Sequence, residues 1–357
     1  MTEATTYKCP NCGSFQKYNP DQQDWHCPFC DASFAESGVL AKGEEFARKA
    51  EGEIPAASVS EEQSGEGEQV TYRCGSCGSE IMTDATTVAT NCYYCHNPVI
   101  LQGKLTADMK PDAVLPFSIG KEKAVEKFLA WVKTKKYIPE GFFSKGQVDT
   151  MSGVYYPHFV TECELDGSYD GQGENVSVMD RGKYIVTKTD HYSFRRRADI
   201  HFRNVIRPAL QSTDRKLSDG IHPFPLEEVK PFSSAYLSGF LAERRDIAAA
   251  DIEANVTSEL EGYVKPMLRE TVNYNSHRGQ TAAKVKSRET KYVLLPTWVL
   301  TYKAKQGDTK PYYYAMNGRT GEVCGKLPID NGKLMRTGLL VAAVVFAGLC
   351  LAGYFFY

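Results

Sequence analysis

The sequence lacks several features that would place it in a familiar functional class. Its formal net charge is only −2 and its pI is near 6.4, so it has no global basic field of the kind that nucleic-acid-binding domains carry. It contains no HExxH, GxSxG or GxxxxGK[ST] motif, and no GxGxxG followed by a helix, which argues against metalloprotease, serine hydrolase, ATPase and dinucleotide chemistry. Residues 1–7 show neither a basic nor an apolar stretch. We therefore expect no secretory signal peptide and a cytosolic N-terminal part.

The composition is that of a globular protein with two or three domains. The chain has 357 residues, of which 42% are hydrophobic and 24% charged, so extensive disorder is not expected. Eight of its 11 cysteines form four CxxC pairs, and in a reducing compartment this spacing indicates metal binding rather than disulfides. The three others, Cys163, Cys324 and Cys350, lie in apolar or strand-like surroundings, and we interpret them as packing residues.

The paired cysteines form an internal repeat. Each unit reads CxxC, fourteen residues, CxxC, and every cysteine of the second unit follows its counterpart by 65 positions. Two CxxC turns that face each other across a hairpin can supply four thiolates to one tetrahedral zinc ion, and Gly13 and Gly78 suit the tight turns. The spacing therefore predicts two structural Zn²⁺ ions, with the ligands Cys9, Cys12, Cys27, Cys30, Cys74, Cys77, Cys92 and Cys95. Because four cysteines close a site, we expect no catalytic zinc.

These units suggest a multidomain chain. We expect a first β zinc ribbon at residues 1–36, an acidic flexible linker at 37–69 and a second ribbon at 70–100. Residues 101–330 would form an α+β domain with an antiparallel sheet, and residues 331–357 a C-terminal membrane anchor. The linker combines an excess of glutamate with few apolar residues, so it has little apolar surface to offset the entropy of ordering.

The expected α+β domain contains recognisable elements. Apolar residues at helical spacing predict an amphipathic helix over 121–136, and a second helix is expected from about Ala242 to Leu260, continuing toward Arg269. Between them, short β-rich runs such as "GVYYPHFVTECEL" and "GKYIVTKTDHYSF" flank a predicted turn, "DGSYDGQGEN". Further strands are expected in "KYVLLPTWVLTYKA" and around the turn Asn317–Gly321.

A local basic cluster lies within the β-rich region. It could contact an anionic partner such as nucleic acid, acidic lipid or an acidic protein segment, and its members are Arg195, Arg196, Arg197, Arg203 and Arg207. The alternative is an ordinary solvated strand face with cross-strand ion pairs. Histidines are scattered nearby without the spacing of metal ligands.

The C-terminal segment predicts one transmembrane α-helix. No residue from Thr337 to Tyr357 is charged, and about 20 helical residues cross the hydrocarbon layer of a bilayer. Lys326, Lys333 and Arg336 precede the segment, so the positive-inside rule predicts a single-pass protein of a bacterial cell membrane with its bulk in the cytoplasm. The small residues Gly348 and Ala352 lie one turn apart and would allow close contact between two such helices, so a homo-oligomer is a further possible partner.

Several phrases resemble a known family. "YRCGSCGSE", "NCYYCHNP", "VLPFSIGKEKAVEKFLAWV", "GVYYPHF" and "LPTWVLTYKAKQGDTKPYYYAMNGRTGEVCGKLP" are similar, in this order, to bacterial TFIIB-type zinc-ribbon-containing membrane proteins. Members are often labelled as primosomal-helicase-like, and the resemblance covers roughly residues 72–330. A helicase is not expected here, because no phosphate-binding GxxxxGK[ST] loop is present. The resemblance implies a role as a membrane recruiter for phage-shock or SPFH-type envelope-stress proteins.

Three functional hypotheses follow. The leading one is a non-enzymatic zinc-ribbon membrane adaptor that docks cytosolic or membrane-associated proteins at the inner face of the membrane. The alternative is a membrane-tethered nucleic-acid-binding protein, which is disfavoured because no lysine or arginine lies between Cys77 and Cys92 and phosphate contacts drive such binding. The third is an enzyme with a site built from dispersed histidine, aspartate and arginine residues.

Overall fold

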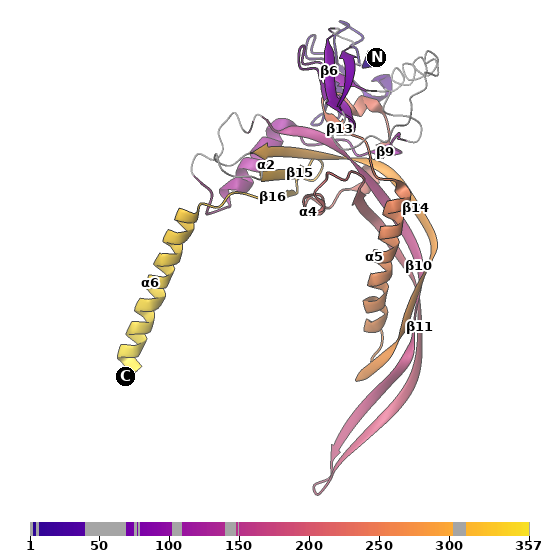
Figure 1. Ribbon diagram of the computed structural model, residues 1–357, viewed down its shortest axis with the longest axis vertical. Helices are drawn as coiled ribbons and strands as arrows, with labels where there is room; N and C mark the ends of the chain where they lie inside the picture. The colour runs from indigo at the N-terminus through magenta and orange to yellow at the C-terminus, as the bar shows by residue number, and fades with distance from the viewer. Residues whose placement is uncertain are drawn as a thin grey trace.

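The computed structural model describes residues 3–4, 7–39, 69–74, 77, 79–101, 109–139, 148, 150–302 and 312–356. A body holds both cysteine repeats, and two long projections leave it (Figure 1). One is a curved arm, formed by residues 160–207 of strands β10 (Ser152–Asp180) and β11 (Ile185–Pro208) and residues 276–291 of strand β14 (Ser276–Tyr302). The other is helix α6 (Asn331–Phe356). Residues 40–68 of the predicted linker lie outside the described residues.

The body and the arm share one ten-stranded sheet, whose main path is β12-β9-β14-β10-β13-β7-β8. Strand β11 pairs with β10, β15 with β14, and β16 with β15. The shorter strands are β7 (Thr87–Asn91), β8 (Pro98–Ile100), β9 (Ala113–Val114), β12 (Lys230–Pro231), β13 (Leu241–Glu243), β15 (Tyr312–Asn317) and β16 (Val323–Gly325).

The strands of this sheet run in both directions. β10 pairs antiparallel with β11 and β14 but parallel with β13, and β14 pairs parallel with β9. The prediction of an antiparallel sheet is therefore wrong in part. Its failure has a simple cause, because the parallel neighbours β9 and β13 have two and three residues and are too short to show a pattern of alternation.

The arm strands are much longer than the short runs predicted from the sequence, with 29 residues in β10, 24 in β11 and 27 in β14. The predicted turn "DGSYDGQGEN" lies inside β10, and the chain reverses instead near Gly182, which has a φ of 76°. A Cβ on Gly171 would lie 2.3 Å from the carbonyl oxygen of Arg278 on β14. The turn prediction is wrong because glycine here allows two backbones to approach closely.

Helix α5 (Ala249–Glu270) packs along the concave side of the arm (Figure 1). Its buried residues recur every four positions, as one face of an α-helix requires, and they are Ile252, Val256, Leu260, Val264 and Leu268. The same core cluster contains Leu165 and Tyr169 of β10. The predicted start near Ala242 is wrong, because β13 occupies Leu241–Glu243 and the helix begins at Ala249. Pro266 lies within the helix and does not end it.

The other predicted elements of the domain are present. Helix α2 (Lys121–Lys133) confirms the amphipathic helix, and the ring of its buried Phe128 lies 4.5 Å from that of Tyr314 on β15. The predicted turn joins β15 to β16, where the buried Asn317 donates from Nδ2 to two carbonyl oxygens at 2.9 Å. The described part of the body also contains the short helical segments α4 (Arg215–Asp219), η2 (Leu226–Glu228) and η3 (Ser234–Leu237).

Among the described residues, α6 is the one helix long and apolar enough to cross a membrane. Its apolar span covers the 21 residues Asn331–Leu351, and none of that span is buried against the rest of the molecule. Lys333 and Arg336 lie in its first two turns. A helix of the predicted length and apolar character is thus present where the sequence indicates one.

Candidate metal centres

The first cysteine repeat brings four thiols together at the end of a small three-stranded sheet of β2 (Lys17–Asn19), β3 (Asp24–His26) and β4 (Ser33–Phe34). The Sγ atoms of Cys9 and Cys30 lie 3.6 Å apart, and those of Cys12 and Cys27 lie 3.5 Å apart. All four sulfurs lie within 4.8 Å of one another. Gly13 adopts a φ of 74°, which confirms the tight turn predicted there.

The second repeat has the same geometry. The Sγ atoms of Cys74 and Cys95 lie 3.8 Å apart, and those of Cys77 and Cys92 lie 3.7 Å apart. His96 follows the last ligand with a φ of 57°, and Asp31 occupies the equivalent place in the first repeat with a φ of 56°. The two CxxC turns therefore close in the same way. Gly78 lies outside the described residues.

Both groups fit a tetrahedral zinc ion. Four sulfurs placed about 2.3 Å from a central zinc are separated by about 3.8 Å, and the closest pairs in the two groups lie 3.5–3.8 Å apart. All the ligands are thiols, which is the donor set of a closed structural site. Bound zinc would supply folding free energy here, because each ribbon is too small to bury a sufficient core by itself.

The pKa values of the thiols in the second group bear on cation binding. The hydroxyl and backbone amide of Ser79 hydrogen-bond the Cys77 sulfur and lower the pKa of that thiol to about 6. Burial, with the neighbouring thiols, raises the pKa of Cys95 to about 12. Four thiolates in one group would repel one another, and a divalent cation at their centre would offset that repulsion.

The first ribbon is built into the main core. Trp25 of β3 is fully buried, and its Nε1 donates to the carbonyl oxygen of Ala235 at 2.9 Å. Its ring centroid lies 5.1 Å from that of Tyr18 and 5.2 Å from that of Tyr236. Because these aromatic rings belong to the same cluster as the core of the arm and the sheet, the first ribbon stabilises the body rather than standing apart from it.

The second ribbon has a small core of its own, formed by Tyr72, Cys74, Ile81, Cys92, Val99 and Leu101. Its strands β5 (Gln69–Cys74) and β6 (Glu80–Asp84) form a separate sheet with β1 (Glu3–Ala4). Among the described strands of this ribbon, β7 and β8 join the main sheet, through the pairing of β7 with β13. The second ribbon is thus attached at its base, and β6 lies at the outer end of the body (Figure 1).

The CxxC turns display aromatic side chains that sequence reasoning did not single out. Tyr93 and Tyr94 lie between the last two ligands of the second ribbon and are 64% and 68% exposed. Met82 of β6 is 58% exposed. In the first ribbon Phe29 holds the equivalent position and is also exposed. Their position in the sequence could have indicated this exposure, because a side chain between the two cysteines of one CxxC turn has little room to point inward.

Three arginines of the predicted basic cluster form ion pairs within the chain. Arg195 and Arg197 both bind the carboxylate of Asp170 on the arm, at 2.9 and 3.1 Å. These bonds outweigh the opposing effect of desolvation and hold the pKa of Asp170 below its usual value. Arg207 instead binds Glu259 of α5 at 2.7 Å. At least three of the five arginines therefore form cross-strand or helix–strand ion pairs, as in the alternative interpretation.

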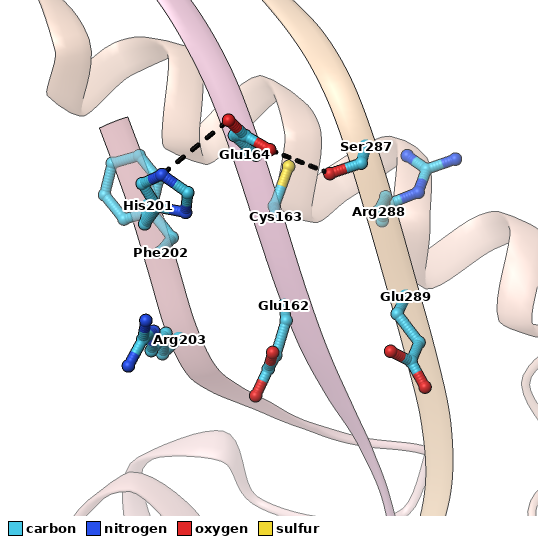
Figure 2. Close-up of a pocket in the computed structure, with 9 residues that line it drawn as sticks. All are labelled: Glu162, Cys163, Glu164, His201, Phe202, Arg203, Ser287, Arg288 and Glu289. Carbon is cyan, nitrogen blue, oxygen red and sulfur yellow. Dashed lines mark hydrogen bonds and ion pairs between the residues drawn. The ribbon is translucent and has the colours of Figure 1, made fainter. Parts of the chain in front are cut away.

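A hollow of about 510 Å³ crosses the three arm strands (Figure 2). Glu164 lies at its centre, with Ser287 Oγ at 3.3 Å on one side and His201 Nε2 at 3.7 Å on the other. A nucleophilic relay needs the histidine between the serine and the acid, and here the acid lies between the other two. Cys163 is buried beside them, and burial raises the pKa of its thiol. The hollow therefore lacks the arrangement of a serine or cysteine nucleophile.

Comparisons with known proteins add one relative. The chain is similar to the uncharacterized protein YdjG of Bacillus subtilis (strain 168), with 28% identity over 242 residues, which cover 66% of this chain and 69% of that protein. No family model matches the chain. No solved structure matches it either.

Proposed function

We propose that this protein is a non-enzymatic adaptor that docks cytosolic proteins at the inner face of a bacterial membrane. The observation that carries the proposal is the exposed pair Tyr93–Tyr94 on a tetracysteine turn, in a molecule that also bears an unburied apolar helix. Exposed aromatic side chains on a rigid support are typical of protein interfaces. Zinc at the adjacent site would fix their positions without taking part in a reaction.

The orientation follows from the charges at the start of α6. Lys333 and Arg336 lie at the end of the helix nearest the body, and a positive flank favours the cytoplasmic side of a membrane. The body would then be cytoplasmic and the helix would cross the membrane once. In Figure 1 the second ribbon and α6 leave the body in different directions. With the body in the cytoplasm, this arrangement would leave Tyr93 and Tyr94 accessible to cytosolic proteins.

Protein partners fit this surface better than nucleic acid does. Tyrosines can stack on bases, but phosphate binding also needs nearby cations, and no lysine or arginine lies between Cys77 and Cys92. Arg195 and Arg197 belong to the arm and bind Asp170. Among possible protein partners, the family resemblance favours membrane-associated proteins of the phage-shock or SPFH type.

The test is co-purification of the full-length chain from nuclease-treated membranes, with partners identified by mass spectrometry. Tyr93→Ser combined with Tyr94→Ser removes the aromatic surface and keeps every cysteine ligand. Tyr263→Ser, which changes a 52% exposed tyrosine on α5, is the matched control. We expect the double variant to lose partners that the control retains, while both retain about two zinc ions per chain.

Two results would contradict the proposal of an adaptor whose docking surface contains Tyr93 and Tyr94. One is wild-type protein that carries nucleic acid before nuclease treatment and no protein partner after it. The other is a partner set that the double tyrosine variant leaves unchanged. The first result would favour the nucleic-acid alternative, and the second would place the docking surface elsewhere.

A further inference from the structure

We propose that the end of α2 and the start of α6 together form a binding site for the phosphate headgroups of anionic phospholipids. This inference rests on the crossing of the membrane by α6, which is part of the proposed function. It adds a ligand of defined chemistry. It also gives the soluble body, and not only the anchor helix, a direct contact with the membrane surface.

Direct hydrogen bonds hold the residues after α2 against the start of α6. The backbone amide of Asp330 donates to the carbonyl oxygen of Tyr137 at 2.7 Å. Nζ of Lys333 donates to the carbonyl oxygen of Ile138 at 3.1 Å. Figure 1 shows the end of α2 beside the start of α6, although Lys333 follows Ile138 by 195 positions. The fold therefore places the end of α2 where α6 would enter the membrane.

This contact gathers positive charge at one place. Residues 133–136 and 326–336 contain six cationic side chains and one carboxylate, that of Asp330. Oδ1 of Asp330 accepts the backbone amides of Gly332 and Lys333 at 2.9 and 3.1 Å, so this carboxylate caps α6. The six cations form the juxtamembrane cluster, and they are Lys133, Lys135, Lys136, Lys326, Lys333 and Arg336.

The three lysines that α2 and its following residues contribute are available to a ligand. All three are exposed, and they are Lys133, Lys135 and Lys136. None of them takes part in an ion pair between described residues. Each lysine or arginine close to an anionic membrane surface strengthens the attraction by about fivefold. These lysines therefore add substantially to the cations of α6 itself.

Aromatic and apolar side chains accompany the cations. Nζ of Lys135 lies 5.1 Å from the centre of the partly buried Trp131 ring. A Cβ on Gly325, which precedes Lys326, would lie 3.4 Å from the same ring. Three apolar side chains at the start of the anchor are exposed, namely Ile329, Leu334 and Met335. Tryptophan and lysine favour the headgroup level of a bilayer, and aliphatic side chains favour the acyl chains below it.

This combination identifies the ligand as a lipid. An anionic phospholipid offers a phosphate to the cations and acyl chains to the apolar residues, whereas a soluble polyanion offers only the first. The position beside α6 favours the same ligand, because lipids surround a helix that crosses the membrane. Phosphatidylglycerol has the required charge and serves as the probe.

The test uses the full-length protein in phosphatidylcholine vesicles that contain a trace of chain-labelled phosphatidylglycerol or, in a parallel sample, chain-labelled phosphatidylcholine. Both lipids carry a spin label, and electron paramagnetic resonance measures the fraction that contact with the protein immobilises. We expect wild type to favour phosphatidylglycerol by about fivefold or more. Lys133→Gln combined with Lys135→Gln and Lys136→Gln should lose most of this preference. Arginine at the same three positions should keep it, because arginine also binds phosphate.

The matched control is Lys8→Gln combined with Lys17→Gln and Lys110→Gln. It removes the same charge from exposed lysines of the first ribbon and of the segment before β9, and it should keep the preference. An equal loss in this control would show an effect of net charge alone and would overturn the proposal. A glutamine variant that keeps the wild-type preference would also overturn it. So would loss of the preference on addition of inorganic phosphate at constant ionic strength, which would indicate a site for free phosphate.

The same measurement separates this site from the proposed function. If wild type immobilises neither labelled lipid, α6 does not enter the membrane, and both the lipid site and the membrane adaptor are refuted. If wild type immobilises both lipids equally, the lipid site alone is refuted. The tyrosine variants test the adaptor independently, because they leave α2 and α6 unchanged.

Discussion

Trp25→Ala tests whether the first ribbon is part of the main core. The indole is fully buried between Tyr18 and Tyr236, and its Nε1 donates to the carbonyl oxygen of Ala235. Replacing a buried tryptophan by alanine costs about 3–5 kcal/mol of unfolding free energy, and the unpaired carbonyl adds about 1 kcal/mol. At about 2–4 °C per kcal/mol for a domain of this size, the melting temperature should fall by roughly 10–20 °C.

The assay is a thermal melt of the detergent-solubilised full chain, followed by near-ultraviolet circular dichroism and by zinc release. Phe29→Ala is the control, because it removes a 68% exposed aromatic ring from the same ribbon. This ring contacts Phe15 edge-on, with 5.3 Å between the centroids, so its loss should lower the unfolding free energy by only about 1 kcal/mol. Trp25→Ala keeps all four ligands, so zinc binding below the melting temperature should persist. If the two variants melt within about 3 °C of each other, the first ribbon does not share the core and the reasoning fails.

Burial lowers the pKa of His158 from its usual 6.5 to about 4, and below pH 6.5 the unfolded chain binds a proton that the folded chain does not. His158 therefore does not lower the free energy of unfolding above pH 6.5, but lowers it by up to about 3 kcal/mol as the pH falls to about 4. His158→Gln should remove this loss, which urea melts at graded pH would measure. Gly171→Ala should lower the melting temperature, because its Cβ would meet the Arg278 carbonyl oxygen at 2.3 Å. Gly262→Ala, with open space around it, should raise the free energy of unfolding by about 0.5–1 kcal/mol. A higher melting temperature for Gly171→Ala than for Gly262→Ala would contradict this packing. Cys74→Ser with Cys77→Ser should reduce bound zinc, measured by elemental analysis, from about two ions to about one per chain, and a wild-type chain without zinc would refute both metal centres.

The features predicted correctly from the sequence depend on local spacing. Cysteine spacing determines which thiols can meet, so both tetracysteine groups were predictable down to each cysteine. The period of apolar residues predicted α2, and an uninterrupted apolar run predicted α6. In each case the information lies within a few turns or one hairpin of chain, where side-chain geometry follows directly from sequence separation.

The features that could not be predicted depend on distant contacts. The glycines of β10 have the composition of a turn, and only their closeness to β14 shows that they belong to a strand. Likewise, Arg207 belongs to a basic run in the sequence but binds Glu259, 52 positions away. Nothing near Trp25 indicates that its indole is covered by residues 210 positions later. Such pairings are set by the tertiary fold, which overrides local propensity.

The last of these pairings has a consequence for synthesis on the ribosome. The first ribbon is translated early, but Ala235 follows Trp25 by 210 residues, which at about 5–20 residues per second is an interval of roughly 10–40 s. Throughout that time the aromatic face of the ribbon has no native surface to cover it. Metal captured by Cys9, Cys12, Cys27 and Cys30 would keep the nascent ribbon folded, so zinc supply during translation would influence how much chain reaches the native state.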